Sequence, residues 1–239
     1  MNFRIMEKPT QKKEKLDTRE GSGLYAPQRR MFLRYAGATA LATTLLLTTS
    51  CDDDDDGMTD PEAVDLGSGD TGILNYAYAL EQLEAAFYTE VVARSLSVFS
   101  QTEQQIMQDL KGHESIHRDF LKAALGSAAI PDLEVNFSSI NFNDKSSILT
   151  TARTFEDLGV AAYNGAGQYL ENAGFLTLAG KIVSVEARHA AVIRDLITNG
   201  TFSDSANNQG LDPAMMPADV LQAASPFIVT KISANNLPK

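Results

Sequence analysis

The amino-acid sequence predicts an all-α protein built around a four-helix bundle. Apolar residues recur at helical spacing over long segments between Ile73 and Asn199. Cap residues divide this region into four segments of helical length, with one long non-helical connection between the second and the third. Hydrophobic residues make up 44% of the 239 residues, which is ordinary for a globular protein.

The first two helices form a predicted hairpin. The first helix is expected over about residues 72–97. Ser100 or Thr102 then offers an N-cap, each with Glu or Gln three residues later, which is the capping-box pattern. The second helix runs to about Leu125, where Gly126 ends it. Only a few residues join the two helices, so they should lie side by side and antiparallel.

The third and fourth helices form a second predicted hairpin. Asp144 or Ser146 caps the third helix, which is expected to end near residues 172–174. The fourth is expected over about residues 177–199, followed by Gly200. The connection between the hairpins has about 18 residues and spans up to roughly 60 Å when extended, whereas a 25-residue helix is roughly 37 Å long. The sequence therefore predicts two antiparallel hairpins joined by a long crossover.

Two of the three histidines follow a glutamate by three residues. Glu114-x-x-His117 lies in the second helix and Glu186-x-x-His189 in the fourth. Residues three apart share one face of a helix, and the flanking apolar residues place both pairs on the inward stripe. Both pairs are therefore expected to project into the core of the bundle.

The first and third helices repeat one another around a glutamate. Glu81 and Glu156 each begin the pattern E-x-L-x-x-A-x-Y, which ends at Tyr88 and Tyr163. The two glutamates are expected to face the same core as the E-x-x-H pairs. The two tyrosines are expected either to pack in the core or to donate hydrogen bonds to the carboxylates.

Glu84 is an alternative to Glu81 as the inward glutamate of the first helix, because its apolar neighbours put it on an adjacent apolar face. In the internal repeat Glu84 aligns with Gly159, which has no side chain. The repeat therefore favours Glu81.

Together the four helices offer Glu, E-x-x-H, Glu and E-x-x-H, which is the ligand set of di-iron and di-manganese carboxylate bundles. The predicted metal ligands are Glu81, Glu114, His117, Glu156, Glu186 and His189. Four carboxylates converging in a core would be strongly destabilising without compensating charge, which two divalent cations supply. Oxygen and nitrogen ligands without thiolate favour iron, with manganese as the second candidate. No catalytic residue is predicted beyond the metal ligands.

Residues 113–117 also match H-E-x-x-H, in which two histidines bind zinc and the glutamate acts as general base. This alternative would make His113 and His117 ligands, with His189 as the remaining histidine of the chain. The residue four positions before His189 is Val185, so His113 has no counterpart in the second pair. The predicted site therefore excludes His113, and the zinc-protease match is interpreted as a coincidence of one extra histidine.

The motifs of the four helices resemble those of ferritin-like domain proteins, in particular the bacterial group that is similar to plant desiccation-related proteins. The resemblance is carried by LEQLEAAFY, GHESIHRDFL, FEDLGVAAYNGA and VEARHAAVIRDL over about residues 71–200, and MPADVLQAASPFI near the C-terminus is similar to the same group. It implies a ferritin-like four-helix bundle with a dinuclear site formed by the six glutamates and histidines named above. The resemblance does not imply one particular reaction.

The first fifty residues have the features of an export signal. Residues 29–34, RRMFLR, resemble the twin-arginine motif, and an apolar run leads from there to Cys51. Cys51 is the single cysteine, and it stands where a bacterial lipoprotein signal is cut and acylated. The sequence therefore predicts a signal peptide over residues 1–50 and an exported protein, anchored in a membrane of the cell envelope by a lipid on Cys51.

Charge divides at the same cysteine. Residues 1–50 carry nine Lys and Arg against four Asp and Glu, and the remaining residues carry 11 against 27. Such an acidic mature protein is not expected to bind nucleic acid. Residues 51–71 are interpreted as an acidic linker, residues 72–200 as the bundle and residues 201–239 as a C-terminal extension.

Two interpretations of the function follow from these patterns. In the first, a dinuclear centre oxidises ferrous iron or reduces O₂ or peroxide at the cell envelope, so that the partners are metal ions and these oxidants. In the second, the bundle is a structural or stress-protective binding protein with little turnover. The patterns do not indicate an oligomeric state.

Overall fold

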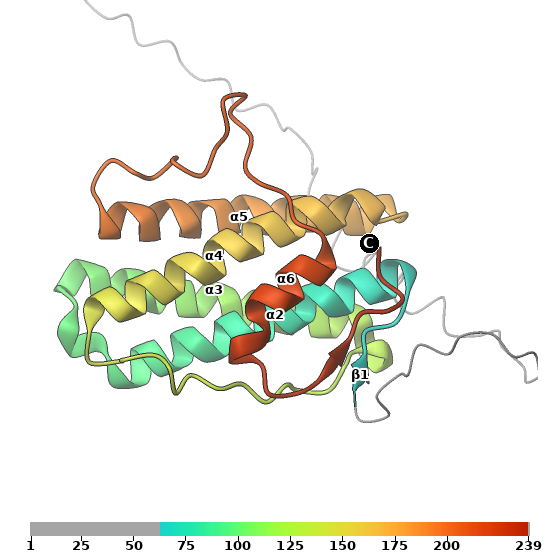
Figure 1. The fold of residues 1–239 in the computed structure, drawn as a ribbon, viewed down its shortest axis with the longest axis horizontal. Coiled ribbons are helices and arrows are strands. Elements are labelled where there is room, and N and C mark those ends of the chain that lie inside the picture. The colour runs from blue at the N-terminus through green and yellow to red at the C-terminus, as the bar shows by residue number, and fades with distance from the viewer. Residues whose placement is uncertain (1–62, 239) are drawn as a thin grey trace, which may run out of the picture.

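The computed structural model describes residues 63–238, so Cys51, the twin-arginine pattern and most of the acidic linker lie outside the described residues. Four long helices form the bundle: α2 (Gly69–Arg94), α3 (Gln101–Leu125), α4 (Lys145–Ala166) and α5 (Ala173–Ile197). The shorter elements are β1 (Val64–Asp65), η1 (Leu96–Val98), η2 (Gly126–Ala128), η3 (Gly167–Tyr169), α6 (Pro217–Ala224), η4 (Ser225–Phe227) and β2 (Ile232–Ser233). α2 packs along α3 and α4 packs along α5 (Figure 1). The predicted four-helix bundle of two hairpins is confirmed.

The capping box predicted for the second helix begins α3. The Ser100 hydroxyl accepts the Glu103 N–H, and the Glu103 carboxylate accepts the Ser100 N–H at 2.8 Å. Gly126 follows the last residue of α3 with φ 56°, a conformation that glycine adopts without the steric cost of a side chain. Both ends of α3 therefore follow from local sequence.

The boundary between α4 and α5 differs from the prediction. α4 ends at Ala166, well before the predicted end at residues 172–174, and η3 follows it. α5 begins directly after Asn172, because the Asn172 side chain accepts two backbone N–H groups of the first turn of α5. Asn with Gly two residues later, as in residues 172–174, is compatible with a helix end, but an Asn side chain is also a strong N-cap, and Asn172 has that role here.

The crossover runs beside α2 from the end of α3 to the start of α4 (Figure 1). Two buried amides of α2 hold it in place. Asn75 donates to the carbonyl of Ala128 at 2.9 Å and accepts the N–H of Ile130 at 3.0 Å, and Gln82 accepts the N–H of Leu133 at 2.7 Å. These bonds satisfy backbone groups of a connection in which η2 is the single helical turn.

The described part of the predicted linker, residues 63–71, differs from a solvated spacer. β1 pairs in parallel with β2, with Val64 opposite Ile232. Leu66, directly after β1, is fully buried, and α2 begins at Gly69. The described residues before α2 therefore belong to the packed structure.

The C-terminal extension returns across the bundle. α6 packs on α4, and the N–H of Met215 donates to the carbonyl of Ala161 at 3.0 Å. The backbone of Met215 passes so close to Gly165 that a Cβ at residue 165 would lie 1.8 Å from the Met215 carbonyl oxygen. Glycine is therefore required at this crossing. None of the helices within residues 63–238 is long and apolar enough to span a membrane.

Candidate metal centre

The six predicted ligands lie together in the middle of the bundle. α2 contributes Glu81, α3 contributes Glu114 and His117, α4 contributes Glu156, and α5 contributes Glu186 and His189. All four carboxylates are fully buried, and the two imidazoles are 8% and 4% exposed. The cluster therefore lies where bulk water cannot compensate its charges.

The cluster consists of two overlapping groups of ligand atoms. One group, the His117 position, combines Glu81, Glu114, His117 and Glu186; the other, the His189 position, combines Glu114, Glu156, Glu186 and His189. Within each group the ligand atoms lie within 4.8 Å of one another. Glu114 and Glu186 belong to both groups, so the two positions are adjacent and share two carboxylates.

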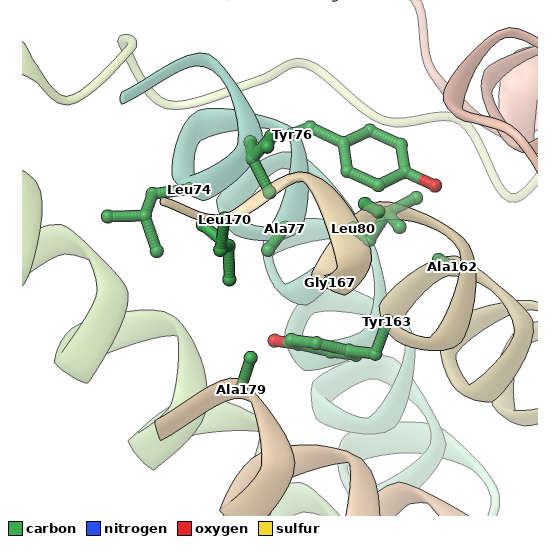
Figure 2. Close-up of a pocket in the computed structure, with 11 residues that line it drawn as sticks. Leu74, Tyr76, Ala77, Leu80, Ala162, Tyr163, Gly167, Leu170 and Ala179 are labelled. Atoms are coloured by element: carbon green, nitrogen blue, oxygen red, sulfur yellow. The ribbon is translucent and has the colours of Figure 1, made fainter. Parts of the chain in front are cut away.

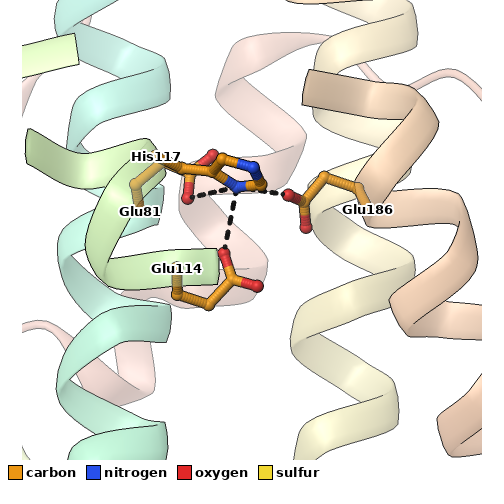
Figure 3. Close-up of side chains that lie close together, drawn as sticks. All are labelled: Glu81, Glu114, His117 and Glu186. Carbon is orange, nitrogen blue, oxygen red and sulfur yellow. Dashed lines mark ion pairs between the residues drawn. The ribbon is translucent and has the colours of Figure 1, made fainter. Parts of the chain in front are cut away.

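At the His117 position, three carboxylates surround one imidazole nitrogen (Figure 3). His117 Nδ1 lies 2.8 Å from Glu186 Oε1, 3.4 Å from Glu114 Oε2 and 3.5 Å from Glu81 Oε2. The three oxygens come from three different helices, which is the arrangement that a cation would need in order to be enclosed by the bundle.

The His189 position repeats this arrangement with the opposite oxygens of the shared carboxylates. His189 Nδ1 lies 2.7 Å from Glu114 Oε1, 3.4 Å from Glu156 Oε2 and 3.6 Å from Glu186 Oε2. Glu114 and Glu186 therefore each direct one oxygen to the His117 position and the other oxygen to the His189 position. Glu81 and Glu156 each serve a single position.

The ligand atoms of the cluster face one another and no other group within the described residues. Apart from the imidazole–carboxylate contacts given above, eight buried atoms have no hydrogen-bond partner there: Glu81 Oε2, both oxygens of Glu114 and of Glu186, Glu156 Oε2, and Nδ1 of His117 and of His189. Buried polar atoms without partners are costly and rare. Their convergence on two points fits two bound cations, because oxygen and nitrogen ligands of this kind match hard and intermediate divalent metals.

Each unshared carboxylate also accepts a hydrogen bond from a tyrosine. Tyr88 donates to Glu156 Oε1 at 2.5 Å, and Tyr163 donates to Glu81 Oε1 at 2.6 Å. The other oxygen of each glutamate, Oε2, faces the cluster. The tyrosines therefore fix the orientation of the two carboxylates that only one position uses.

The match to a known family covers the same part of the chain. Residues 69–199, more than half of the sequence, match the family model described as Ferritin-like domain. The chain belongs to the ferritin-like domain family. A comparison with curated proteins finds no match to the sequence. The four helices that carry the cluster are thus the ferritin-like domain, and the buried glutamates and histidines form its di-metal type of site.

Burial and the neighbouring charges shift the pKa values of the carboxyl groups of the ferritin-like domain in opposite directions. Burial raises the pKa of Glu156 to about 8, against the effect of His189, and burial together with Glu186 raises the pKa of Glu81 well above its usual range. Burial also acts to raise the pKa of Glu114, but the two histidines on either side lower it to about 2. Glu114 therefore carries a negative charge between the two positions.

The carboxylates of the cluster also shift the pKa values of its two imidazoles. Burial acts to lower the pKa of His117 and of His189, but the surrounding carboxylates outweigh it and raise each pKa to about 12. Without a metal ion, both rings are therefore protonated at neutral pH. Because a metal binds neutral imidazole, cations would replace these protons.

Glu84 lies beside the cluster rather than in place of Glu81. It is 3% exposed, and neither group of ligand atoms includes it. A Cβ at Gly159 would lie 3.1 Å from Glu84 Oε1 and 3.7 Å from Glu186 Oε2. The missing side chain at residue 159 therefore leaves the space into which the Glu84 carboxylate projects, which explains why the internal repeat is broken there.

His113 belongs to neither group, so the H-E-x-x-H match does not form a two-histidine ligand pair. His113 nevertheless touches the cluster from outside, because its Nδ1 lies 2.9 Å from Nε2 of His189. The sequence patterns did not predict this contact. No local pattern could have predicted it, since His113 and His189 lie on different helices.

Two small apolar cavities border Tyr163. The larger has a volume of about 20 Å³, and Figure 2 shows the Tyr163 ring extending across it from α4 toward Ala179. The second, of about 10 Å³, is lined by Phe120, Ile182 and their neighbours. A cavity of this size holds about one water molecule. The space beside Tyr163 therefore has room only for a molecule of about the size of water.

Proposed function

We propose that this ferritin-like domain binds two divalent metal ions and uses them to oxidise ferrous iron or to reduce O₂ or peroxide. The observation that carries the proposal is the division of the shared carboxylates. Glu114 and Glu186 each offer one oxygen to His117 and the other to His189. Glu114 and Glu186 would therefore help to hold a cation at each of the two positions.

The charges and ligand types support this assignment. Glu81 and His117 would complete one position, and Glu156 and His189 the other. Four carboxylates balance the charge of two divalent cations, and neutral imidazoles add ligands without adding charge. We infer iron as the first candidate and manganese as the second, because the site offers no thiolate.

When bound, a pair of redox-active ions supplies the two electrons that convert peroxide and two protons to two molecules of water. The protein itself orients the ligand carboxylates and excludes bulk water. Tyr88 and Tyr163 hold the unshared carboxylates, and complete burial of the four ligand carboxylates keeps bulk water from the centre. The small cavities beside Tyr163 support small oxidants in preference to organic substrates.

Turnover can be tested with the purified mature protein, loaded anaerobically with ferrous or manganous ion. Consumption of O₂ and of hydrogen peroxide is then followed, with Glu156→Ala as the variant that loses one position. The proposal expects wild type to consume at least one oxidant and Glu156→Ala to lose most of that activity. Metal-loaded protein that is inert to both oxidants would instead favour the structural or stress-protective binding role.

We also propose export and anchoring through Cys51, on the basis of the RRMFLR pattern and the apolar run before the single cysteine. Expression in a bacterial host tests this directly. Wild type is expected in the membrane fraction and Cys51→Ala in the soluble fraction. An unchanged distribution of Cys51→Ala would contradict lipid anchoring.

A further inference from the structure

The rings of His113 and His189 meet edge to edge at the outer side of the cluster. His113 Nδ1 and His189 Nε2 are 2.9 Å apart. The ring planes differ by only 7°, and the ring centroids are 5.1 Å apart. Nearly coplanar rings at this separation, with nitrogens in contact, direct an N–H of one ring at the lone pair of the other. The contact is therefore a hydrogen bond and not a face-to-face stack.

This hydrogen bond has a defined direction when His189 binds a metal ion. Nδ1 of His189 faces the carboxylates, at 2.7 Å from Glu114 Oε1, so Nδ1 is the ligand atom and carries no proton. The proton of the neutral ring is then on Nε2, which donates to His113 Nδ1. The contact therefore selects one tautomer of His189 and holds the ring in one orientation.

His117 has no such support. Its Nδ1 faces carboxylates in the same way, but none of the described residues forms a hydrogen bond with its Nε2. Val185 stands one turn before His189, as His113 stands one turn before His117, and a valine side chain has no acceptor. The two metal positions thus share their carboxylates and each has one tyrosine, but they differ in the support of the histidine.

We propose that His113 is a positioning residue of the metal centre. By accepting the N–H of His189 it makes the His189 position bind metal more tightly than the His117 position. The inference rests on the dinuclear site proposed above and is independent of turnover. Groups that hold the far N–H of a metal-binding histidine typically change metal affinity by about 10- to 100-fold.

The location of His113 allows a clean set of variants. His113 is an exposed residue of α3, so its replacement leaves the packed core intact. His113→Leu removes the acceptor at similar size, whereas His113→Asn keeps an acceptor, because Asn Oδ1 occupies about the place of His Nδ1. Ile116, which is 64% exposed on the same helix, provides the control Ile116→Ala.

Titration of the metal-free full-length mature protein with Co²⁺, followed by its visible absorption, tests the inference. Wild type is expected to bind two ions in two resolved steps. His113→Leu should weaken the tighter step by about 10- to 100-fold and leave the weaker step unchanged. His113→Asn and Ile116→Ala should both keep the two steps of wild type.

Nitrogen NMR of the zinc-loaded protein gives a second readout that a merely structural role would not affect. The His189 Nε2–H signal should be present and hydrogen-bonded in wild type and in His113→Asn, and shifted or exchanging in His113→Leu. Equal binding curves for wild type and His113→Leu would overturn the inference, as would equal weakening by Leu and Asn. Absence of metal binding by wild type would instead overturn the proposed function, so the two failures are distinguishable.

Discussion

Individual residues of the cluster divide the two oxygens of each carboxylate between different tasks. In Glu81 and Glu156, Oε1 accepts a tyrosine hydroxyl and Oε2 faces the cluster. In Glu114 and Glu186, both oxygens face the cluster. Each glutamate that serves one position thus accepts a tyrosine hydroxyl, and the tyrosine comes from the E-x-L-x-x-A-x-Y segment of the other helix.

Removal of a tyrosine hydroxyl should affect one metal position selectively. In Tyr88→Phe, Glu156 Oε1 loses its donor, and we expect about tenfold or greater weakening of metal binding at the His189 position. Tyr163→Phe should weaken the His117 position in the same way. Metal titration checks both, with Tyr169→Phe, 38% exposed, as the control. Unchanged binding in Tyr88→Phe would contradict the orienting role.

At the scale of elements, local sequence explains the helices better than the connections between them. Ser100, Glu103 and Gly126 delimit α3 as predicted. The end of α4 was predicted wrongly, because Asn172 is compatible both with the end of one helix and with the start of the next. The path of the crossover depends on side chains of α2, which lie far from it in the sequence, so local patterns contain no information about it.

Replacement of Asn75 should show how much its hydrogen bonds to the crossover contribute to stability. Its amide donates to the carbonyls of Leu66 and Ala128 and accepts the N–H of Ile130. Asn75→Ala leaves these buried backbone groups without partners, so we expect the free energy of unfolding to fall by about 2–4 kcal/mol. Chemical denaturation measures this, with exposed Asn143→Ala as the control. A change below about 0.5 kcal/mol would show that the crossover is held in another way.

The candidate site could be predicted because its ligands repeat along the chain. Two E-x-x-H pairs and two E-x-L-x-x-A-x-Y segments identify all six residues that the fold brings together. Glu84 and His113 could not be placed in the same way. The space for Glu84 depends on Gly159 of α4, and the partner of His113 lies on α5; both relations exist only after the hairpins have packed.

At the scale of the whole molecule, the acidic core links stability to metal and to pH. In the metal-free protein, burial raises the pKa of Glu156 to about 8. The protonated Glu156 therefore contributes stability that is fully present below the pKa of a free carboxyl group and is lost as the pH rises through about 8. The pKa values of His117 and His189 are raised to about 12, so the stability that these protonated rings contribute is also lost as the pH rises above the pKa of free histidine. Both effects make the metal-free fold less stable as pH rises.

We therefore expect the thermal midpoint of the metal-free protein to fall between about pH 6 and pH 9. Each proton that the folded state retains and the unfolded state loses changes the free energy of unfolding by about 1.4 kcal/mol per pH unit. Metal-loaded protein should melt at higher temperature and vary much less, because cations replace these protons. A metal-free midpoint that rises over this range would contradict the protonation of the cluster.

The central claim is that six side chains form one site for two metal ions, and the metal content of purified variants tests it most directly. The account predicts about two ions per chain for wild type and for Glu90→Ala, a half-buried glutamate of α2 that pairs with Arg94 away from the cluster. It predicts about one ion for Glu81→Ala, and loss of both for Glu114→Ala, because Glu114 serves both positions. Two ions retained in folded Glu114→Ala, or no more than one ion in wild type, would contradict it.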